Sequence, residues 1–503
     1  MFDIFFIWQK IKKLFSRKDV IFIVILLIVY FLTRLINLDK FPIFGDEGIY
    51  IRWAKTAWHD ASWRFISLTD GRQPLQTWGT IPFLKLFPNN ALLGGRMFAV
   101  ATGLIGLTGI FVLCFYLFGK KAAYWGAFFY ILTPYFLFYD RMALMDSGVN
   151  AAFIWILFFS ILLVRTIRLD VALIFGLIAG LSLLSKSSVK LFIGLSALAP
   201  LLIFEQKKKD NVKKIVNFFL LFLLVCFFAI AIYNIQRLSP YMHFIARKNN
   251  TFVKTISSFM IKPFDGFFYH LQAIIEYVYI ESGYILPFIG IFGLFLLMKK
   301  NWRLSTYLLL WILIPYSIIA TFSIVLYPRY VNFIAMLLIV PATYAVTRAN
   351  KVFARAIIII YIMFVGYFNY TILFDFKKIP FPEIDQGQYI NGGNSGWGAQ
   401  EIIEIAREKA KIKPVIILAE GDFGMSGDVL SVFVNQNDRI NIKGYWPLNK
   451  ETLISQQKEL ADNQVLVVYI YKKSYEPDLP LKLIKRFPKP KSETSMDLFE
   501  LTP

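Results

Sequence analysis

Long apolar runs, separated by short polar loops, fill the first three quarters of the chain. A membrane-spanning helix needs about 20 mostly apolar residues at roughly 1.5 Å of rise each. On that measure the sequence predicts about eleven transmembrane helices, at residues 20–37, 91–118, 122–139, 147–165, 169–185, 189–204, 213–233, 277–298, 304–325, 328–347 and 354–374. This pattern is typical of a polytopic α-helical membrane protein.

The basic residues between these runs predict an orientation. Every second loop is rich in Lys and Arg, as in "QKIKKLFSRK" before the first run and "KKKDNVKK" after the sixth. Basic loops stay in the cytoplasm. We therefore expect a cytoplasmic N-terminus, an extracytoplasmic C-terminus and a place in the plasma membrane. Residues 1–18 are basic and amphipathic without a cleavage pattern, so we expect them to lie along the cytoplasmic membrane face.

Two of the loops predicted to lie outside are long, about 38–90 and about 234–276. In the first, apolar residues recur at helical spacing, which suits a helix in the membrane interface with tryptophans at headgroup depth. These residues are Ile49, Trp53, Ala54, Ala57 and Trp58. The second loop is interpreted as a mobile flap over a site.

Beyond residue 375 the apolar runs stop and strand-like and helix-like segments alternate. "PVIILAE", "RINIKGYW" and "QVLVVYIYKK" predict strands, while "AQEIIEIAREKAK" and "KETLISQQKELAD" predict helices. "LIKRFPK" and "MDLFEL" are expected to form an edge pair. The chain therefore divides into a transmembrane domain, 1–375, and a soluble extracytoplasmic α/β domain, 376–503.

Composition supports this class and excludes others. Of 503 residues, 57% are hydrophobic and 17% are charged, against about 25% charged in soluble proteins. The net charge of +21 lies in short loops that contact membrane lipids, so nucleic acid is not an expected partner. Cys114 and Cys226 lie in apolar runs, and the three histidines (His59, His243 and His270) lack the spacing of metal ligands.

Charged side chains gather on the predicted outer side, beginning with two adjacent carboxylates in "FPIFGDEGIY". The set comprises Asp46, Glu47, Arg72, Arg141, Asp146, Lys186 and Arg329, with Tyr330 beside the last. Cations stabilise a phosphate leaving group, and a carboxylate takes a proton from an attacking hydroxyl. The set therefore suits a phosphate-bearing donor. The alternative is that the cations bind lipid headgroups and the carboxylates are solvated.

Four stretches, spread in order over about 30–350, carry a family resemblance. They are "GDEGIY" followed by a basic residue before "PLQTW", "GRMFAV" running to "YDRMALMDSGVN", "GLSLLSKSSVKLF", and "YPRYVNF". Together they resemble the polyprenyl-phosphate-sugar glycosyltransferases of the GT-C fold, the subgroup of protein O-mannosyltransferases and lipid A aminoarabinose transferases. "GRQPL" replaces the family's "KPPL", and "SKSS" replaces its "aKGp". The oligosaccharyltransferase motif "WWDYG" is absent, which argues against transfer of a whole glycan to asparagine.

The resemblance implies roles for the outer residues. Asp46 would be the catalytic carboxylate that directs or deprotonates the acceptor hydroxyl, and Glu47 would support it. The donor phosphate would be bound by Arg72, Lys186, Arg329 and Arg141, with Asp146 and Tyr330 as further substrate contacts. No cofactor is required on this interpretation, and a divalent metal at Asp46 and Asp146 stays open.

The function implied is transfer of a single sugar, with inversion, from a polyprenyl-phosphate donor to a hydroxyl-bearing acceptor. That acceptor is a protein, a lipid or a wall glycan, and neither it nor the sugar is fixed by the sequence. The alternatives are a transporter or flippase of a lipid-linked or anionic solute, and a scaffold whose soluble tail recruits partners. A transporter would place its charges near the membrane midplane and show repeats.

Overall fold

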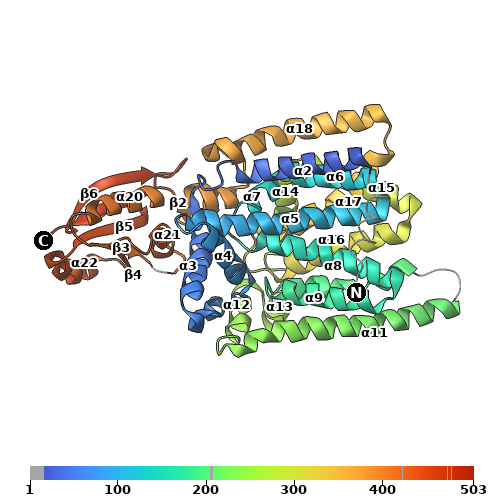
Figure 1. Ribbon diagram of the computed structural model, residues 1–503, viewed down its shortest axis with the longest axis horizontal. Coiled ribbons are helices and arrows are strands. Elements are labelled where there is room, and N and C mark those ends of the chain that lie inside the picture. The colour runs from blue at the N-terminus through green and yellow to red at the C-terminus, as the bar shows by residue number, and fades with distance from the viewer. Residues whose placement is uncertain (1–15, 204–207, 422, 473, 477) are drawn as a thin grey trace.

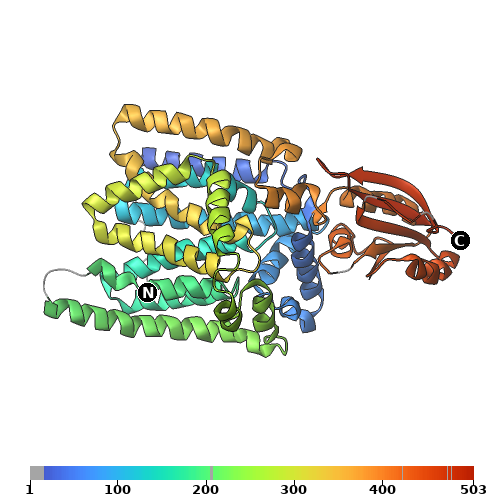
Figure 2. The ribbon, with the colours of Figure 1, turned by 180° about the vertical axis from the view of Figure 1, so that it is seen from behind.

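The computed structural model describes residues 16–203, 208–421, 423–472, 474–476 and 478–503. Most of the expected N-terminal amphipathic segment therefore lies outside the described residues. The helices form an elongated bundle with a sheet domain at one end (Figure 1, and from behind in Figure 2). This end is called the sheet-domain end below.

The bundle helices follow the apolar runs closely. They are α2 (Arg17–Leu35), α5 (Ala91–Phe118), α6 (Lys120–Leu132), α8 (Asp146–Thr166), α9 (Leu169–Leu183), α10 (Val189–Ser196), α11 (Lys208–Tyr233), α15 (Leu286–Lys300), α16 (Trp302–Phe322), α17 (Asn332–Arg348) and α18 (Lys351–Phe374). Among the described residues, five helices are long and apolar enough to cross a membrane, or six if one bent pair is a single span. The protein is thus a multi-pass membrane protein, and the count of eleven spans stays a prediction.

Two expected spans are broken. The run 277–298 is divided between α14 (Phe267–Glu281) and α15, whose axes differ by 104°. Gly283 (φ 79°) and Tyr284 (φ 63°) are left-handed there, so the backbone cannot continue as a helix. The run 122–139 breaks at Pro134 into α6 and α7 (Pro134–Tyr139), because proline has no N–H to donate. The expectation of continuous helices over these two runs was wrong.

The first long loop is folded and buried. It contains α3 (Gly45–His59), η1 (Ala61–Trp63), η2 (Ile66–Asp70) and α4 (Leu75–Leu86). The expected helix is present as α3, but its apolar stripe packs inside the protein, where Trp53 is only 1% exposed. The stripe faces α4 and the sheet domain, so it contacts protein rather than lipid headgroups, and the depth of α3 in the membrane stays a prediction.

The second long loop is helical as well. It forms η4 (Asn234–Leu238), α12 (Phe244–Phe252), α13 (Ile256–Ile261) and the start of α14. Its mobility stays a prediction.

The C-terminal part has the expected alternation of strands and helices. Its sheet has the order β4 (Ile440–Tyr445), β3 (Val415–Glu420), β5 (Gln464–Lys472), β7 (Ser495–Leu501), β6 (Leu481–Pro488). β3 is parallel to β4 and β5, while β7 runs antiparallel to β5 and β6. β7 is therefore interior and largely buried, and β6 alone of the expected edge pair is an edge strand.

Successive side chains of a strand point to opposite faces of its sheet. Alternate residues of β5 therefore pack into two different hydrophobic cores. Leu466 and Val468 pack with α20 (Ala399–Ala410) and α21 (Ser426–Ser431). Val465 and Val467 pack on the opposite face with α22 (Lys450–Gln456). Helices thus cover both faces of the sheet.

The sheet domain and the bundle share α3. The short strand β1 (Ile43–Phe44) pairs antiparallel with β2 (Ser395–Gly396). The core of the sheet domain on the α21 side also includes Ile51 and Ala54 of α3. Lys55 donates to two carbonyls at and just past the end of α21, those of Ser431 at 3.0 Å and Val434 at 2.8 Å. α3 is therefore held between the two parts of the molecule.

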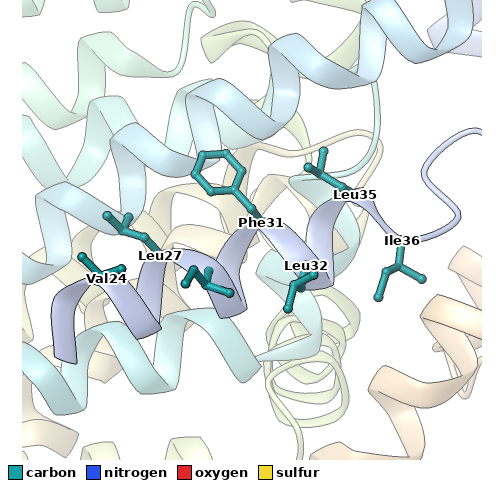
Figure 3. Close-up of a pocket in the computed structure, with 7 residues that line it drawn as sticks. Val24, Leu27, Phe31, Leu32, Leu35 and Ile36 are labelled. Carbon is teal, nitrogen blue, oxygen red and sulfur yellow. The ribbon is translucent and has the colours of Figure 1, made fainter. Parts of the chain in front are cut away.

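One face of α2 is lined by apolar side chains. An open hollow of about 490 Å³ runs along α2 and is lined by Val24, Leu27, Ile28, Phe31, Leu32, Leu35 and Ile36 (Figure 3). Such a face is compatible with lipid. It includes none of the charged residues singled out in the sequence.

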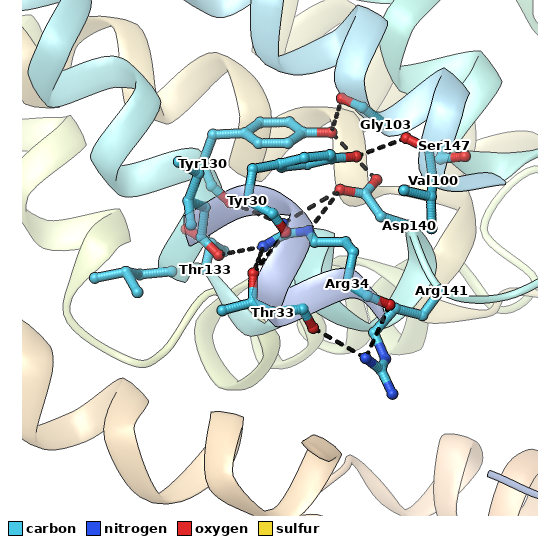
Figure 4. A network of polar contacts seen from close by, with 12 residues as sticks. Tyr30, Thr33, Arg34, Val100, Gly103, Tyr130, Thr133, Asp140, Arg141 and Ser147 are labelled. Atoms are coloured by element: carbon cyan, nitrogen blue, oxygen red, sulfur yellow. Dashed lines mark hydrogen bonds and ion pairs between the residues drawn. The ribbon is translucent and has the colours of Figure 1, made fainter. Parts of the chain in front are cut away.

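The opposite side of α2 carries a buried polar network (Figure 4). Arg34 pairs with Asp140 at 3.2 Å and donates to the carbonyl of Ile131 at 2.6 Å. Tyr130 donates its hydroxyl to the same aspartate at 3.2 Å. These contacts join α2 to α6 and to the end of α7, which fixes where the chain leaves the bundle.

The buried side chain of Lys489 helps to attach the sheet domain to the segment before it, and a substitution there can test this. It is 2% exposed and donates to the carbonyls of Gly392 at 2.7 Å and Ser395 at 3.0 Å. A typical intramolecular hydrogen bond contributes about 0.5–1.5 kcal/mol to stability. We expect Lys489→Met to lower the thermal-unfolding midpoint in detergent and to speed proteolysis within 376–397. The exposed Lys482→Met on β6 is the control, and equal midpoints for both variants would contradict this fastening.

Candidate active site

Asp46 lies between two arginines that are distant from it in sequence. Its Oδ1 accepts a hydrogen bond from Nη2 of Arg72 at 3.2 Å, and its Oδ2 accepts one from Nη2 of Arg329 at 3.1 Å. Arg72 follows η2, and Arg329 belongs to η5 (Pro328–Tyr330). Three residues singled out from the sequence thus meet at the sheet-domain end of the bundle.

The local fold places Asp46 in the first turn of α3. The positive end of the helix dipole favours a carboxylate at this position. The residue before it must be small, because a Cβ on Gly45 would come within 3.0 Å of the Gly424 carbonyl oxygen. The Gly45 N–H donates to the carbonyl of Asn394 at 2.9 Å. The start of α3 is therefore fixed against the sheet domain.

Glu47 turns the other way and is fully buried. Arg96 of α5 donates two hydrogen bonds of 2.8 Å to its carboxylate, from Nε and from Nη2. The backbone N–H groups of Phe44 and Ala143 donate to it at 3.0 and 2.7 Å. The structure places Glu47 as an anchor beneath Asp46, with its oxygens occupied by protein donors.

A second charged pair completes the site. Lys186, in the turn before α10, donates to Oδ1 of Asp146 at 3.1 Å. Its Nζ also lies 4.3 Å from the ring centre of Tyr330, while the Arg329 guanidinium lies 5.5 Å from that centre. Both cations therefore contact the ring of Tyr330, which connects the two charged pairs through cation–π contacts.

Three residues at the site were not singled out from the sequence. Asp70 forms an ion pair with Arg72, whose Nε lies 3.0 Å from its Oδ2, and its Oδ1 accepts a hydrogen bond from Lys248 of α12 at 2.7 Å. Tyr389 accepts from Nη1 of Arg329 at 3.2 Å.

Only one of these three had a usable sequence signal. Asp70 stands two positions before Arg72 in "DGRQPL", so the same motif could have pointed to it. Lys248 is one of several basic residues of its loop. Tyr389 lies past the expected domain boundary, in the helical turn η7 (Gln386–Asn391).

Arg141 is not brought to this cluster. Its Nη1 donates to the carbonyl oxygens of Thr33 and Arg34, at 2.9 and 3.0 Å (Figure 4). Nη1 and Nη2 also donate to the carbonyl oxygens of Ile36 and Asn37, at 2.7 and 3.2 Å. The last carbonyls of a helix have no intrahelical partner. Arg141 satisfies those at the end of α2, and its donors are committed there.

The arginines keep Asp46 ionised. Burial by itself raises the pKa of Asp46, but Arg72 and Arg329 lower the pKa by more, so it lies below its usual range. Four cations (Arg72, Lys186, Lys248 and Arg329) face three carboxylates (Asp46, Asp70 and Asp146). The cluster therefore holds one positive charge in excess.

The site residues do not fit a divalent metal well. Across the part of the chain that the structure describes, no three His, Cys, Asp or Glu side chains form a group that could hold a metal ion. Both oxygens of Asp46 already accept from arginines, and Asp146 is paired with Lys186. A metal ion there would have to displace these cations.

Comparisons with known proteins agree with this architecture. The family model for dolichyl-phosphate-mannose-protein mannosyltransferase matches residues 72–233. The crystal structure of ArnT from Cupriavidus metallidurans in the apo state is similar, with a TM-score of 0.61 at 15% identity over 96% of this chain and 97% of that one. The structure of ArnT bound to undecaprenyl phosphate gives 0.63 at 15% identity, with the same coverage.

A second type of relative is more distant. The archaeal oligosaccharyltransferase AglB from Archaeoglobus fulgidus, in complex with an inhibitory peptide and a dolichol-phosphate, has a TM-score of 0.51 at 14% identity, over 89% of this chain and 69% of that one. No curated protein sequence matches the chain. The expected GT-C fold is confirmed.

The anchor role of Glu47 predicts a large stability effect. Removing one partner of a buried ion pair typically costs about 3–5 kcal/mol, because the other charge is left unpaired. We expect Arg96→Met to lower the thermal-unfolding midpoint strongly in detergent, and by more than Asp46→Asn does, because the Asp46 side chain is 23% exposed whereas those of Arg96 and Glu47 are 0% exposed. Arg355→Met, exposed on α18, is the control. The anchor assignment fails if Arg96→Met unfolds at the same temperature as that control.

Proposed function

We propose that this protein transfers a single sugar, with inversion, from a polyprenyl-phosphate donor to a hydroxyl group of an acceptor. The observation that carries the proposal is an ionised Asp46 held between Arg72 and Arg329, beside the Lys186–Asp146 pair. The undecaprenyl phosphate bound to ArnT supports a lipid phosphate as the donor group.

The charge of the cluster suits such a donor. A sugar phosphodiester carries one negative charge, which matches the single positive charge left in the cluster. The side chains of Lys186 and Arg72 are 27% and 17% exposed, so both can reach a ligand. The donor phosphate would bind over Tyr330, between Lys186 and Arg329.

The reaction is a single in-line displacement. The acceptor oxygen forms a bond to the anomeric carbon while the bond from that carbon to the phosphate oxygen breaks. The phosphate oxygen keeps the electron pair, and polyprenyl phosphate leaves with an added negative charge that the cations stabilise. The acceptor proton passes to Asp46 and then to solvent.

The arginines shape the part played by Asp46. Each carboxylate oxygen has two lone pairs, so an oxygen that accepts from an arginine can also accept from the acceptor hydroxyl. A low pKa makes Asp46 a weak base. It therefore orients the hydroxyl first and takes the proton late, when the new bond has largely formed.

The membrane sets where the substrates meet. We propose that the sheet-domain end is extracytoplasmic and that the N-terminus is cytoplasmic. The donor then reaches the site from the bilayer, and the acceptor reaches it from the side of the sheet domain. The cations supply the charge stabilisation that a metal would otherwise give, so we propose that no cofactor is required.

Loss of the Asp46 charge is the direct test. Membranes with wild type or Asp46→Asn are incubated with a panel of polyprenyl-phosphate sugars, and each donor is followed by mass spectrometry. Acid–base catalysis contributes about 10²–10⁴-fold, so we expect one donor to be consumed by the wild type and hardly at all by the variant.

Asp60→Asn, an exposed carboxylate just past the other end of α3, is the matched control and should keep full activity. Equal donor consumption by Asp46→Asn and wild type would overturn the assignment. If folded wild type consumes no donor with acceptor present, but carries lipid-linked sugar across vesicle membranes, the transporter interpretation is favoured.

A second pair of variants separates phosphate binding from structure. Loss of a hydrogen bond to a charged group costs about 1.5–3 kcal/mol, or roughly 10–100-fold in binding. We expect Lys186→Met to raise the KM for the donor by that factor. Arg141→Met should instead lower the thermal-unfolding midpoint and leave the KM unchanged. A raised KM with Arg141→Met alone would place the phosphate at Arg141.

A further inference from the structure

Two buried carboxyl groups lie behind Arg329 and have no part in the transfer step. Glu281 is the last residue of α14, and Asp385 ends the short helix α19 (Glu383–Asp385). They are 1% and 0% exposed, and their side chains are hydrogen-bonded to each other. They connect the bend between α14 and α15 to the segment that leads to the sheet domain.

The contact between them requires a proton. Among the described residues, no N–H or hydroxyl donates to either oxygen of Glu281. Asp385 accepts from the Tyr139 hydroxyl at 2.6 Å and from Nε2 of Gln388 at 3.4 Å. Two ionised carboxylates in contact inside a protein repel strongly, and an unpaired buried charge is costly. Glu281 therefore carries the proton and donates it to an ionised Asp385.

Two tyrosines connect this pair to Arg329. Tyr139 donates its hydroxyl hydrogen to Asp385, and its ring packs edge-on against the ring of Tyr389, with ring centres 6.2 Å apart. The oxygen of Tyr389 accepts the Arg329 N–H.

The backbone beside Arg329 is held by the same helix. Tyr135, also on α7, donates to the carbonyl of Pro328 at 2.7 Å. The side chain and the backbone of η5 are thus both tied to α7.

We propose that Glu281 and Asp385 share one proton and, through Tyr139 and Tyr389, act as a positioning pair that orients Arg329 toward the donor phosphate. The assignment of Arg329 to the phosphate rests on the proposed function. The negative charge of the pair holds the Tyr139 hydroxyl, and with it the ring that packs against Tyr389. A second proton would neutralise Asp385 and weaken its charge-assisted bond from Tyr139.

The surroundings make this pair sensitive to pH. Burial raises the pKa of Asp385 to about 6, although the hydrogen bond from Tyr139 and the charge of Arg329 act against this. The other ionisable groups that act on the pair are Tyr135 and Tyr139 on α7, Tyr277 on α14, Tyr389, Arg329 and Asp146. Burial raises the pKa of Tyr389, which stays neutral. As pH falls through about 6, Asp385 gains its proton and Arg329 loses its orientation.

Glu281→Gln tests the shared proton, because glutamine keeps the size and an N–H donor but cannot carry an acidic proton. We compare infrared difference spectra of wild type and variant near neutral pH. We expect the wild type to show the C=O stretch of a protonated carboxylic acid that Glu281→Gln lacks. Glu276→Gln, exposed on the same helix, should keep this band. No difference in the band would overturn the shared proton.

The link to Arg329 is tested by binding, independently of sugar transfer. The Kd of undecaprenyl phosphate is measured in detergent from about pH 5 to pH 8, and titration of the ligand is common to all variants. Tyr139→Phe keeps the protonated carboxylic acid and its infrared band but removes the hydrogen bond between Tyr139 and Asp385. We expect the Kd of the wild type to rise several-fold more between pH 8 and pH 5 than the Kd of Tyr139→Phe. Identical Kd profiles for these two proteins would overturn the positioning role. Absence of sugar turnover with an intact Kd profile would overturn the proposed function alone.

Discussion

The buried pair of Glu47 and Arg96 is the contact on which the site depends. Arg96 donates to both oxygens of the carboxylate and also to the carbonyls of the incoming loop, those of Leu38, Phe41 and Pro42. Consecutive residues of an α-helix point about 100° apart. Fixing Glu47 in the interior therefore fixes the outward direction of Asp46. The two adjacent carboxylates have different roles: Asp46 faces the proposed ligand, and Glu47 holds α3 in position.

The site is assembled from residues of both the helical bundle and the segment that leads to the sheet domain. α3 packs against the bundle on one side and against α21 on the other. Arg329 comes from the bundle, and Tyr389, which holds it, comes from the segment between α18 and the sheet domain. Because that segment packs on the first loop through β1 and β2, seating of the sheet domain and orientation of Arg329 are coupled. The sheet domain is thus part of what keeps the cations in place.

Hydropathy and alternation were enough to predict the bundle helices and the sheet domain, because both patterns report directly which residues leave water. They could not predict the break after Glu281, which depends on backbone angles at Gly283 and Tyr284. At the site, the sequence pointed to Asp46, Arg72, Lys186, Arg329 and Tyr330, which the structure brings together. It could not show that Arg141 caps α2 or that Tyr389 supports Arg329, because the matching of donors to acceptors is decided by tertiary packing rather than by local pattern.

The carboxylates of the cluster also explain how four cations can lie close together before a ligand binds. Cations gathered without counter-charges would repel one another and their side chains would spread into solvent. Asp46, Asp70 and Asp146 each bridge or pair with cations at 2.7–3.2 Å, so the arrangement exists before the phosphate arrives. A phosphodiester then adds the one missing negative charge without having to order the side chains. Preorganisation of this kind places stabilisation on the leaving phosphate, whose charge grows in the transition state, and this is where electrostatic catalysis is most effective.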